Sequence, residues 1–217
     1  MTEGEPLIRW DWVAGHLDEI GQRLFEHVEL TVIAVGLGFV IAFGLALLIV
    51  QRPRLEGPVT FATGTLYTIP SLALFALLIP YTGLSILTAE IGLVSYTLLI
   101  LIRNIVRGIR GVPAEVREAA IGMGYTPRGL LWRIEVPLAL AVIIAGVRVA
   151  TISTIGLVTV TALIGQGGFG FLILIGIQRF FSTELIVGAV CSVALAILAD
   201  ALIVLLQRRL TPWTRLA

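Results

Sequence analysis

The sequence contains little charge for its length. Only 13% of its 217 residues are Asp, Glu, Lys or Arg, whereas 58% are hydrophobic. An ordinary water-soluble domain has about 25% charged and about 45–50% apolar residues. Because so few charges cannot cover a surface in contact with water, the composition predicts an integral membrane protein.

Lysine is absent, and cysteine and histidine are scarce. All 15 basic residues are arginines. A P-loop needs a lysine on the β- and γ-phosphates, so the chain is not an ordinary nucleotide-hydrolysing subunit, and a lysine Schiff base is excluded as well. The single cysteine, Cys191, cannot form an intrachain disulfide. His16 and His27 have no Cys or His companions nearby, so we expect no metal site.

Five apolar runs predict an all-α bundle of five membrane spans. A helix needs roughly 20 apolar residues to cross about 30 Å of hydrocarbon. The glycine-rich run "GQGGFGFLILIGI" is not counted as a full span. Residues 1–29 are expected to form a tail outside the membrane, residues 30–207 the transmembrane domain, and residues 208–217 a second tail. The predicted spans are residues 30–50, 59–79, 86–102, 138–164 and 185–206.

The distribution of arginine predicts the orientation of the chain. If the N-terminus lies outside, the external parts contain only Arg9, Arg23 and Arg179. This asymmetry is what the positive-inside rule describes, and it places the C-terminus in the cytoplasm. No secretory signal peptide is visible, so the first span is expected to act as its own insertion signal. The arginines then on the cytoplasmic side are Arg52, Arg54, Arg103, Arg107, Arg110, Arg117, Arg128, Arg133, Arg208, Arg209 and Arg215.

Apolar residues in the N-terminal tail recur at steps of three and four, which indicates one face of a helix. Two interpretations remain open: a helix lying on the outer leaflet before the first span, or a docking surface for an external partner. The residues concerned are Val13, Leu17, Ile20, Leu24 and Val28.

The polar loop over residues 103–137 has the punctuation of a compact helix–turn–helix. Pro113 suits the first turn of a helix that would stop at Gly124, because glycine tolerates the left-handed conformation of a C-terminal cap. Thr126 offers an N-cap oxygen and Pro127 the first position of a second helix. Pro137 removes a backbone donor where the chain returns to the bilayer. The loop is either a helix pair packed under the bundle or a rigid docking element for a cytoplasmic partner.

This loop, "EAAIGMGYTPRGLLWRIEVP", resembles the EAA loop of permease subunits of bacterial ABC importers, whose form is E-A-A-x3-G-x9-I-x-L-P. The only departure is Val136, where leucine is usual. The resemblance implies a MetI-like permease bundle in the bacterial cell membrane, with the loop as a coupling helix that docks into an ATPase subunit. The positions carried over are Glu118, Ala119, Ala120, Gly124, Ile134 and Pro137.

The resemblance also implies the partners and the substrate class. The partners would be cytoplasmic ATPase subunits that use ATP and Mg, a second permease subunit and an extracytoplasmic binding protein, within membrane lipid and without nucleic acid. This chain would bind no cofactor and would not itself be an enzyme. Segments such as "TIPSLALFALLIPYTGL" and "ALIGQGGFG" look like the osmoprotectant branch, which imports glycine betaine, choline, carnitine or proline betaine. Methionine and other amino-acid importers share this architecture and remain the alternative.

Two segments are candidates for the substrate pathway. Pro70 should kink or locally unwind the second span, and irregular backbone at membrane depth occurs where it lines a cavity or is buried in protein. Hydroxyl groups near Pro70 would either contact the solute or bond to their own helix. The glycine-rich run would either form a mobile outer gate or allow tight helix packing. The candidates are Thr68, Pro70, Ser71, Tyr81, Gly165, Gln166, Gly167 and Gly168.

Arg148 and Asp200 are the charges deep in the last two spans, and such residues usually pair or face the interior. We predict that they pair or meet a neighbouring subunit, with a snorkelling Arg148 as the alternative.

Tryptophan, the best aromatic partner of quaternary ammonium groups, lies only outside the predicted spans. We therefore expect a low-affinity gated path, with selectivity in the binding protein.

Two other functions are less consistent with the sequence. A passive channel would leave the helix pair in the loop unexplained, and a membrane enzyme would lack a catalytic cluster.

Overall fold

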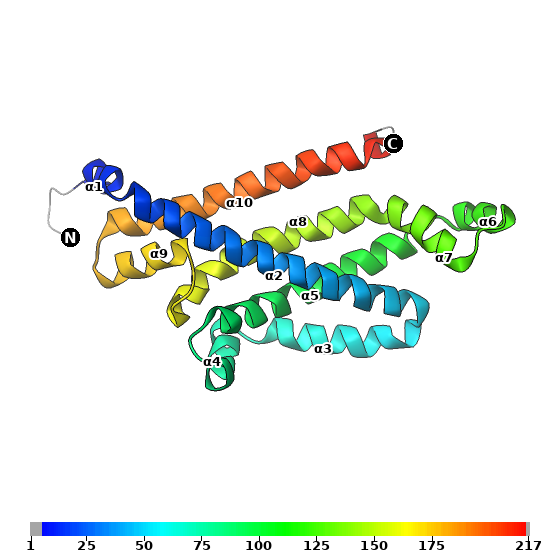
Figure 1. The fold of residues 1–217 in the computed structure, drawn as a ribbon, viewed down its shortest axis with the longest axis horizontal. Coiled ribbons are helices and arrows are strands. Elements are labelled where there is room, and N and C mark those ends of the chain that lie inside the picture. Colours follow the sequence, from blue (N-terminus) through cyan, green and yellow to red (C-terminus); the bar gives the residue numbers. More distant parts are fainter. Residues whose placement is uncertain (1–5, 216–217) are drawn as a thin grey trace. The chain divides into compact units, whose positions relative to one another are not determined.

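A computed structural model describes residues 6–215, which form helices joined by short connecting segments, without a strand (Figure 1). The predicted tail residues 1–5 and 216–217 lie outside the described residues. The prediction of an all-α protein is therefore confirmed. The helices are α1 (Trp10–Gly15), α2 (Leu17–Gln51), η1 (Pro53–Leu55), α3 (Glu56–Thr68), α4 (Ser71–Thr82), α5 (Ile86–Arg110), α6 (Ala114–Gly122), α7 (Pro127–Leu130), η2 (Leu131–Glu135), α8 (Val136–Val160), η3 (Thr161–Ile164), α9 (Phe169–Gln178), α10 (Ser182–Leu210) and η4 (Pro212–Arg215).

Within the described range, four helical segments are long and apolar enough to cross a membrane, and a broken pair of helices makes a fifth. The four are α2, α5, the run Pro127–Ile164 and α10. The broken pair is α3 and α4, separated at Ile69 and Pro70. Pro70 has no N–H to donate and disfavours helical geometry at Ile69, which explains the break. The predicted interruption of the second span is confirmed.

The first membrane helix is longer than predicted. We expected a separate amphipathic helix before residue 30, but α2 continues without a break from Leu17 to Gln51. Two polar residues at this point form contacts without interrupting the helix. Nε2 of buried His27 lies 3.0 Å from the carbonyl oxygen of Ile155, and the Thr31 hydroxyl donates to the His27 carbonyl at 2.8 Å. Polar groups that find partners in this way do not end a helix.

The chain forms two compact units. Unit 1 contains the chain up to Val35, Ile69–Val94 and Thr151–Ala199, and unit 2 contains Gly36–Thr68, Ser95–Ala150 and the chain from Asp200 onward. Unit 1 has a small apolar core from α2, α4, α5, α8 and η3. Its buried members are Leu30, Ala34, Phe75, Ala89, Leu93, Val158 and Ile164.

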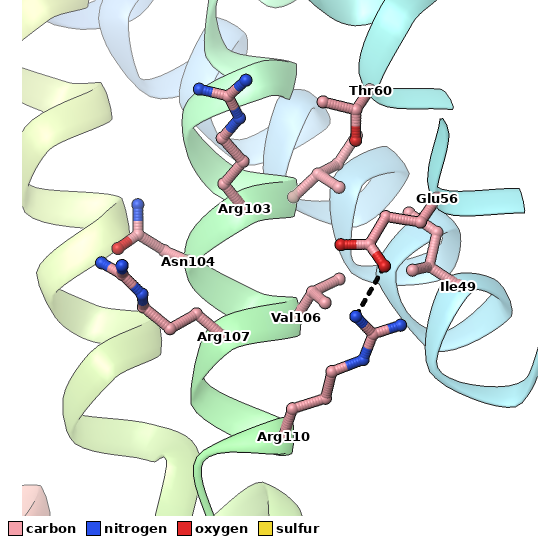
Figure 2. A pocket seen from close by; sticks show the side chains of 9 residues that line it. Ile49, Glu56, Thr60, Arg103, Asn104, Val106, Arg107 and Arg110 are labelled. Atoms are coloured by element: carbon pink, nitrogen blue, oxygen red, sulfur yellow. Dashed lines mark hydrogen bonds and ion pairs between the residues drawn. The ribbon is translucent and has the colours of Figure 1, made fainter. Parts of the chain in front are cut away.

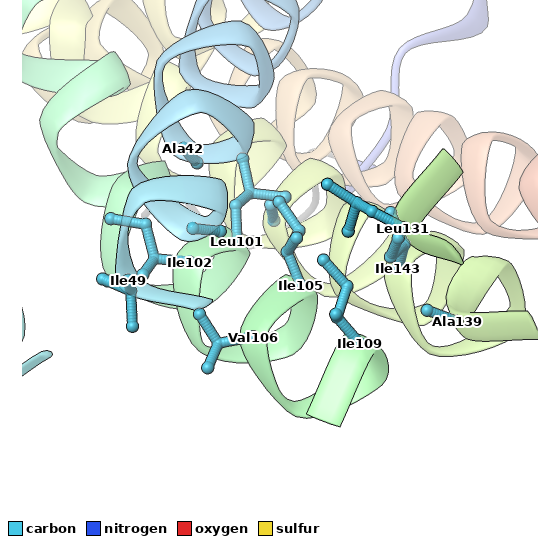
Figure 3. Packing of buried hydrophobic residues seen from close by; sticks show 12 residues of the cluster. Ala42, Ile49, Leu101, Ile102, Ile105, Val106, Ile109, Leu131, Ala139 and Ile143 are labelled. Atoms are coloured by element: carbon cyan, nitrogen blue, oxygen red, sulfur yellow. The ribbon is translucent and has the colours of Figure 1, made fainter. Parts of the chain in front are cut away.

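Unit 2 has a larger core, which Figure 3 shows. Ala42 and Ala46 of α2 are fully buried in it, and such small residues let helix backbones approach closely. Leu131 of η2 is also buried in this core, so the segment after α7 is anchored to the unit 2 bundle. The other members are Ile49, Leu101, Ile102, Ile105, Val106, Ile109, Ala139, Ile143 and Ala150.

Candidate functional site

The loop between α5 and α8 folds as the predicted helix–turn–helix. Gly124 has a φ of +85°, the left-handed conformation that favours glycine, and it follows α6 after one residue. The N–H of Tyr125 then donates to the carbonyl of Ala120 at 3.2 Å, which closes the end of the helix. Thr126 caps α7, since its hydroxyl accepts from the N–H of Gly129 at 3.2 Å. The predicted caps are confirmed.

The second helix of the loop does not stop before the membrane span. α7 passes into a π-helical turn, Leu131–Glu135, and then into α8, which contains Pro137. Proline in a helix loses one hydrogen bond and crowds the carbonyl four residues earlier, here that of Arg133. The wider π turn just before Pro137 accommodates both effects. The loop is therefore continuous with the membrane helix that follows it.

An ion pair that sequence analysis missed fixes α6 to the rest of unit 2. Nε of Arg117 lies 2.9 Å from Oε1 of Glu135 in the π turn, and Glu135 is only 8% exposed. The same guanidinium donates through Nη2 to the carbonyl of Ile109 at 2.6 Å, near the end of α5. Arg117 thus joins α6 to the end of one membrane helix and the beginning of another. No periodicity links these positions, so only the fold reveals the contact.

The EAA positions divide into exposed and buried residues. Glu118, Ala119 and Gly124 are exposed, whereas Ile134 and Pro137 are half-buried. Ala120 is 1% exposed, so this side chain packs against its own chain instead of offering a contact surface as we expected. The reason is that Ala120 lies on the inner face of α6.

Around Glu118 and Ala119, α6 also exposes large apolar side chains. Ile121 is 59% and Met123 is 70% exposed. Exposed hydrophobic residues that lie together outside the apolar spans are typical of interaction surfaces. We call these residues, Val116, Glu118, Ala119, Ile121 and Met123, the α6 face.

The candidate pathway residues near Pro70 lie at the broken span. The Thr68 hydroxyl donates to the Thr65 carbonyl at 2.8 Å, so it bonds to its own helix, as the alternative interpretation held. Pro70 precedes α4, and Ser71 is the first residue of that helix and half-buried. Tyr81 is 87% exposed near the end of α4.

The glycine-rich run forms a tight turn between η3 and α9. Gly165, Gly167 and Gly168 have φ values of +80°, +152° and +47°. A Cβ on Gly168 would lie 2.6 Å from Cβ of His27, which leaves no room for a side chain. Gly167 and Gly168 are buried, and Gly165, Gln166 and Gly167 line a cavity of about 150 Å³. Close packing therefore accounts for the two buried glycines.

Arg148 of α8 and Asp200 of α10 form the predicted pair. Nη2 of Arg148 donates to Oδ2 of Asp200 at 2.8 Å, and Nε donates to the other carboxylate oxygen. This two-point geometry is the strong form of an arginine–carboxylate contact. Both residues belong to unit 2, so the pair joins the two helices within that unit.

Comparisons with known proteins agree with this architecture. Residues 34–215 match the family model described as "Binding-protein-dependent transport system inner membrane component". The osmoprotectant import permease protein OsmW of Salmonella typhimurium is 40% identical over 204 residues, 92% of this chain and 94% of that protein. The choline transport system permease protein OpuBB of Bacillus subtilis is 36% identical over 194 residues, 89% of each chain.

A solved structure supports the fold. The inward-facing MetNI methionine ABC transporter includes a chain that superposes with a TM-score of 0.82, covering 91% of this chain and 98% of that one. At 21% sequence identity this likeness concerns the fold alone. From the family match over most of its length, together with the multi-span helical fold, the chain belongs to the family of inner membrane components of binding-protein-dependent transport systems.

Proposed function

We propose that this chain is the permease subunit of an ATP-driven importer of osmoprotectants, small quaternary ammonium compounds such as glycine betaine, choline, carnitine or proline betaine. Similarity to OsmW and OpuBB along about nine tenths of the chain supports this substrate class. The likeness to a methionine transporter is one of fold at 21% identity, so it gives the amino-acid alternative less support.

The observation that carries the transport mechanism is the α6 face. It combines exposed apolar side chains with an exposed carboxylate, Glu118, on a short helix that is followed by the left-handed Gly124. A cytoplasmic ATPase subunit docks on this face. That subunit, and not this chain, binds and hydrolyses ATP with Mg. A protein without lysine has no P-loop of its own.

Movement of the docked α6 is transmitted through Arg117. Its guanidinium contacts Ile109 near the end of α5 and Glu135 just before α8. A displacement of α6 by the ATPase therefore acts on two membrane helices at once. The broken span at Pro70 and the turn at Gly165–Gly168 are the places where the helical backbone is already interrupted, and we assign them to the pathway and its gate.

The arrangement in the cell follows from the arginines. The N-terminus lies outside and the C-terminus in the cytoplasm of a bacterial cell with this chain in its plasma membrane. A second permease subunit completes the pathway, and α10, whose outer face exposes Val190, Val193 and Ile197, contacts that subunit or lipid. An extracytoplasmic binding protein supplies the selectivity. Tryptophan is the best aromatic partner of a quaternary ammonium group, and the tryptophans of this chain lie in α1, η2 and η4: Trp10, Trp12, Trp132 and Trp213.

The test is reconstitution with the candidate ATPase and binding protein in liposomes. Glu118→Arg reverses a charge on the α6 face, and we expect it to weaken co-purification of the ATPase and to abolish osmolyte-stimulated ATP hydrolysis. The matched control is Asp18→Arg, the same charge change on an exposed residue of α2, which should retain the ATPase. Unchanged coupling in Glu118→Arg would contradict the docking assignment. Stimulation by methionine instead of betaine would contradict the substrate class.

A further inference from the structure

A cavity of about 470 Å³ lies in unit 2 among the ends of α2, α3 and α5 (Figure 2). A water molecule takes up about 30 Å³ in the liquid, so the cavity has room for a much larger group. Its floor is apolar, since Ile49, Ile102 and Val106 are buried there. Its polar lining comes from Glu56 and Thr60 of α3 and from Arg103, Asn104, Arg107 and Arg110 of α5.

The charges around this cavity do not balance. Arg110 pairs with Glu56 through Nη1 and Oε2 at 2.6 Å. In the part of the chain that the structure describes, Arg103 and Arg107 have no carboxylate partner, and both side chains are exposed. Figure 2 shows the dashed line from Arg110 to Glu56 and none from the other two arginines. Two guanidinium groups therefore remain for an external anion.

Two simpler explanations do not account for Arg103. Basic residues near a helix C-terminus are stabilised by the helix dipole, but this effect fades within the last turn, and Arg103 precedes the last residue of α5 by about two turns. A snorkelling arginine needs only a path to water. It does not need two further arginines at helical steps of four and three, Arg107 and Arg110, facing one shared cavity.

The depth of the cavity identifies the anion. Arg103 directly follows the apolar run that ends at Ile102, and Arg110 lies seven residues further, about 10 Å along the helix. That interval has the scale of the polar headgroup layer at one face of a bilayer. The anion that is abundant at this depth is a phospholipid phosphate, and basic pockets between membrane helices bind such headgroups. The apolar floor suits the glycerol and acyl parts of the same molecule.

We propose that Arg103 and Arg107 hold the phosphate of an anionic phospholipid in this cavity, with Ile49, Ile102 and Val106 against its apolar part. The planar guanidinium groups match phosphate oxygens in pairs. Glu56 limits the strength of this site, because it neutralises Arg110.

The test uses the purified full chain in detergent and measures the apparent affinity for phosphatidylglycerol and phosphatidylcholine by native mass spectrometry. The wild-type chain should prefer phosphatidylglycerol. Arg103→Gln with Arg107→Gln should weaken phosphatidylglycerol binding about 30-fold, from about fivefold per arginine. Arg103→Lys with Arg107→Lys should weaken binding less than the glutamine pair, because the charge is kept while the paired guanidinium contacts are lost.

Two further variants distinguish this site from general surface charge. Arg52→Gln with Arg54→Gln removes the same charge from arginines that do not line the cavity, and the affinity should not change. Glu56→Gln should tighten phosphatidylglycerol binding about fivefold, because it frees Arg110. This gain is a result that a merely structural role of these residues would not produce.

Circular dichroism and gel filtration would verify that each variant is folded. Equal phosphatidylglycerol affinity in the wild type and in Arg103→Gln with Arg107→Gln would overturn the proposal. An equal loss in Arg52→Gln with Arg54→Gln would also overturn it. Inorganic phosphate that displaces phosphatidylglycerol completely at millimolar concentration would show a free-anion site instead of a lipid site.

Discussion

Replacing Arg117 with alanine should loosen α6 from the remainder of unit 2. The change removes the ion pair to Glu135 at 2.9 Å and the hydrogen bond to the Ile109 carbonyl at 2.6 Å. It also leaves the carboxylate of Glu135, a residue only 8% exposed, without its cation. A hydrogen bond from a charged group contributes about 1.5–3 kcal/mol, and an unsatisfied buried group costs about 1–3 kcal/mol.

The expected magnitude is smaller than the sum of these contributions. The Arg117 side chain is 32% exposed, so water already screens part of the interaction. We expect a loss of about 3 kcal/mol in the free energy that holds α6 in place, which corresponds to roughly 150-fold more frequent opening. Glu135→Ala keeps the bond to Ile109 and leaves a guanidinium that reaches water, so it should lose only about 1 kcal/mol, or about fivefold.

Hydrogen exchange of the amides in Ala114–Gly122, followed by mass spectrometry, measures this opening. The double variant Arg117→Ala with Glu135→Ala should exchange more slowly than Arg117→Ala alone, because no buried carboxylate is left unpaired. Arg128→Ala, an exposed arginine on α7, is the control and should behave as wild type. Exchange in Arg117→Ala within twofold of wild type, or a double variant faster than both single ones, would refute the reasoning.

Two further predictions concern packing in the spans. Asp200→Ala leaves Arg148 unpaired in an apolar helix, where a charge at full membrane depth costs at least about 2.5 kcal/mol, so the melting temperature in detergent should fall. Removing Arg148 as well should restore part of the melting temperature. No recovery in the double variant would contradict the pairing. Gly92→Ala places a methyl group closer to the ring of Phe75 than contact distance, and it should cost about 1–3 kcal/mol of stability. Gly156→Ala is the control and should be tolerated, because the space around Gly156 is open. Equal melting temperatures for the two alanine variants would show that the Phe75 ring moves away freely.

Local signals in the sequence were sufficient for the helix–turn–helix loop. Gly124 occupies the left-handed position, and Thr126 caps the helix that Pro127 begins. Each of these preferences depends on backbone sterics or on a hydrogen bond within a few residues, so no tertiary information is needed. The interruption at Pro70 is predictable for the same reason.

The sequence was less informative where a helix meets its neighbours. The beginning of α2 was expected to be a separate helix, because its apolar residues recur at steps of three and four before the continuous apolar run begins at residue 30. The partner that allows His27 to be buried is the Ile155 carbonyl, which is remote in the chain. Ala120 was expected on the docking surface, but its burial depends on which face of α6 turns inward.

The amino-acid sequence alone determined that this is a helical membrane protein with up to five spans, a proline-broken second span and a rigid polar loop. These properties follow from the transfer of apolar residues into a membrane and from local backbone geometry. The tertiary structure alone decided that Arg117 joins α6 to two membrane helices, which side of α6 is exposed, and that Arg103 and Arg107 share a cavity. Those facts depend on distances between residues far apart in the chain, and only the packing of the helices sets such distances.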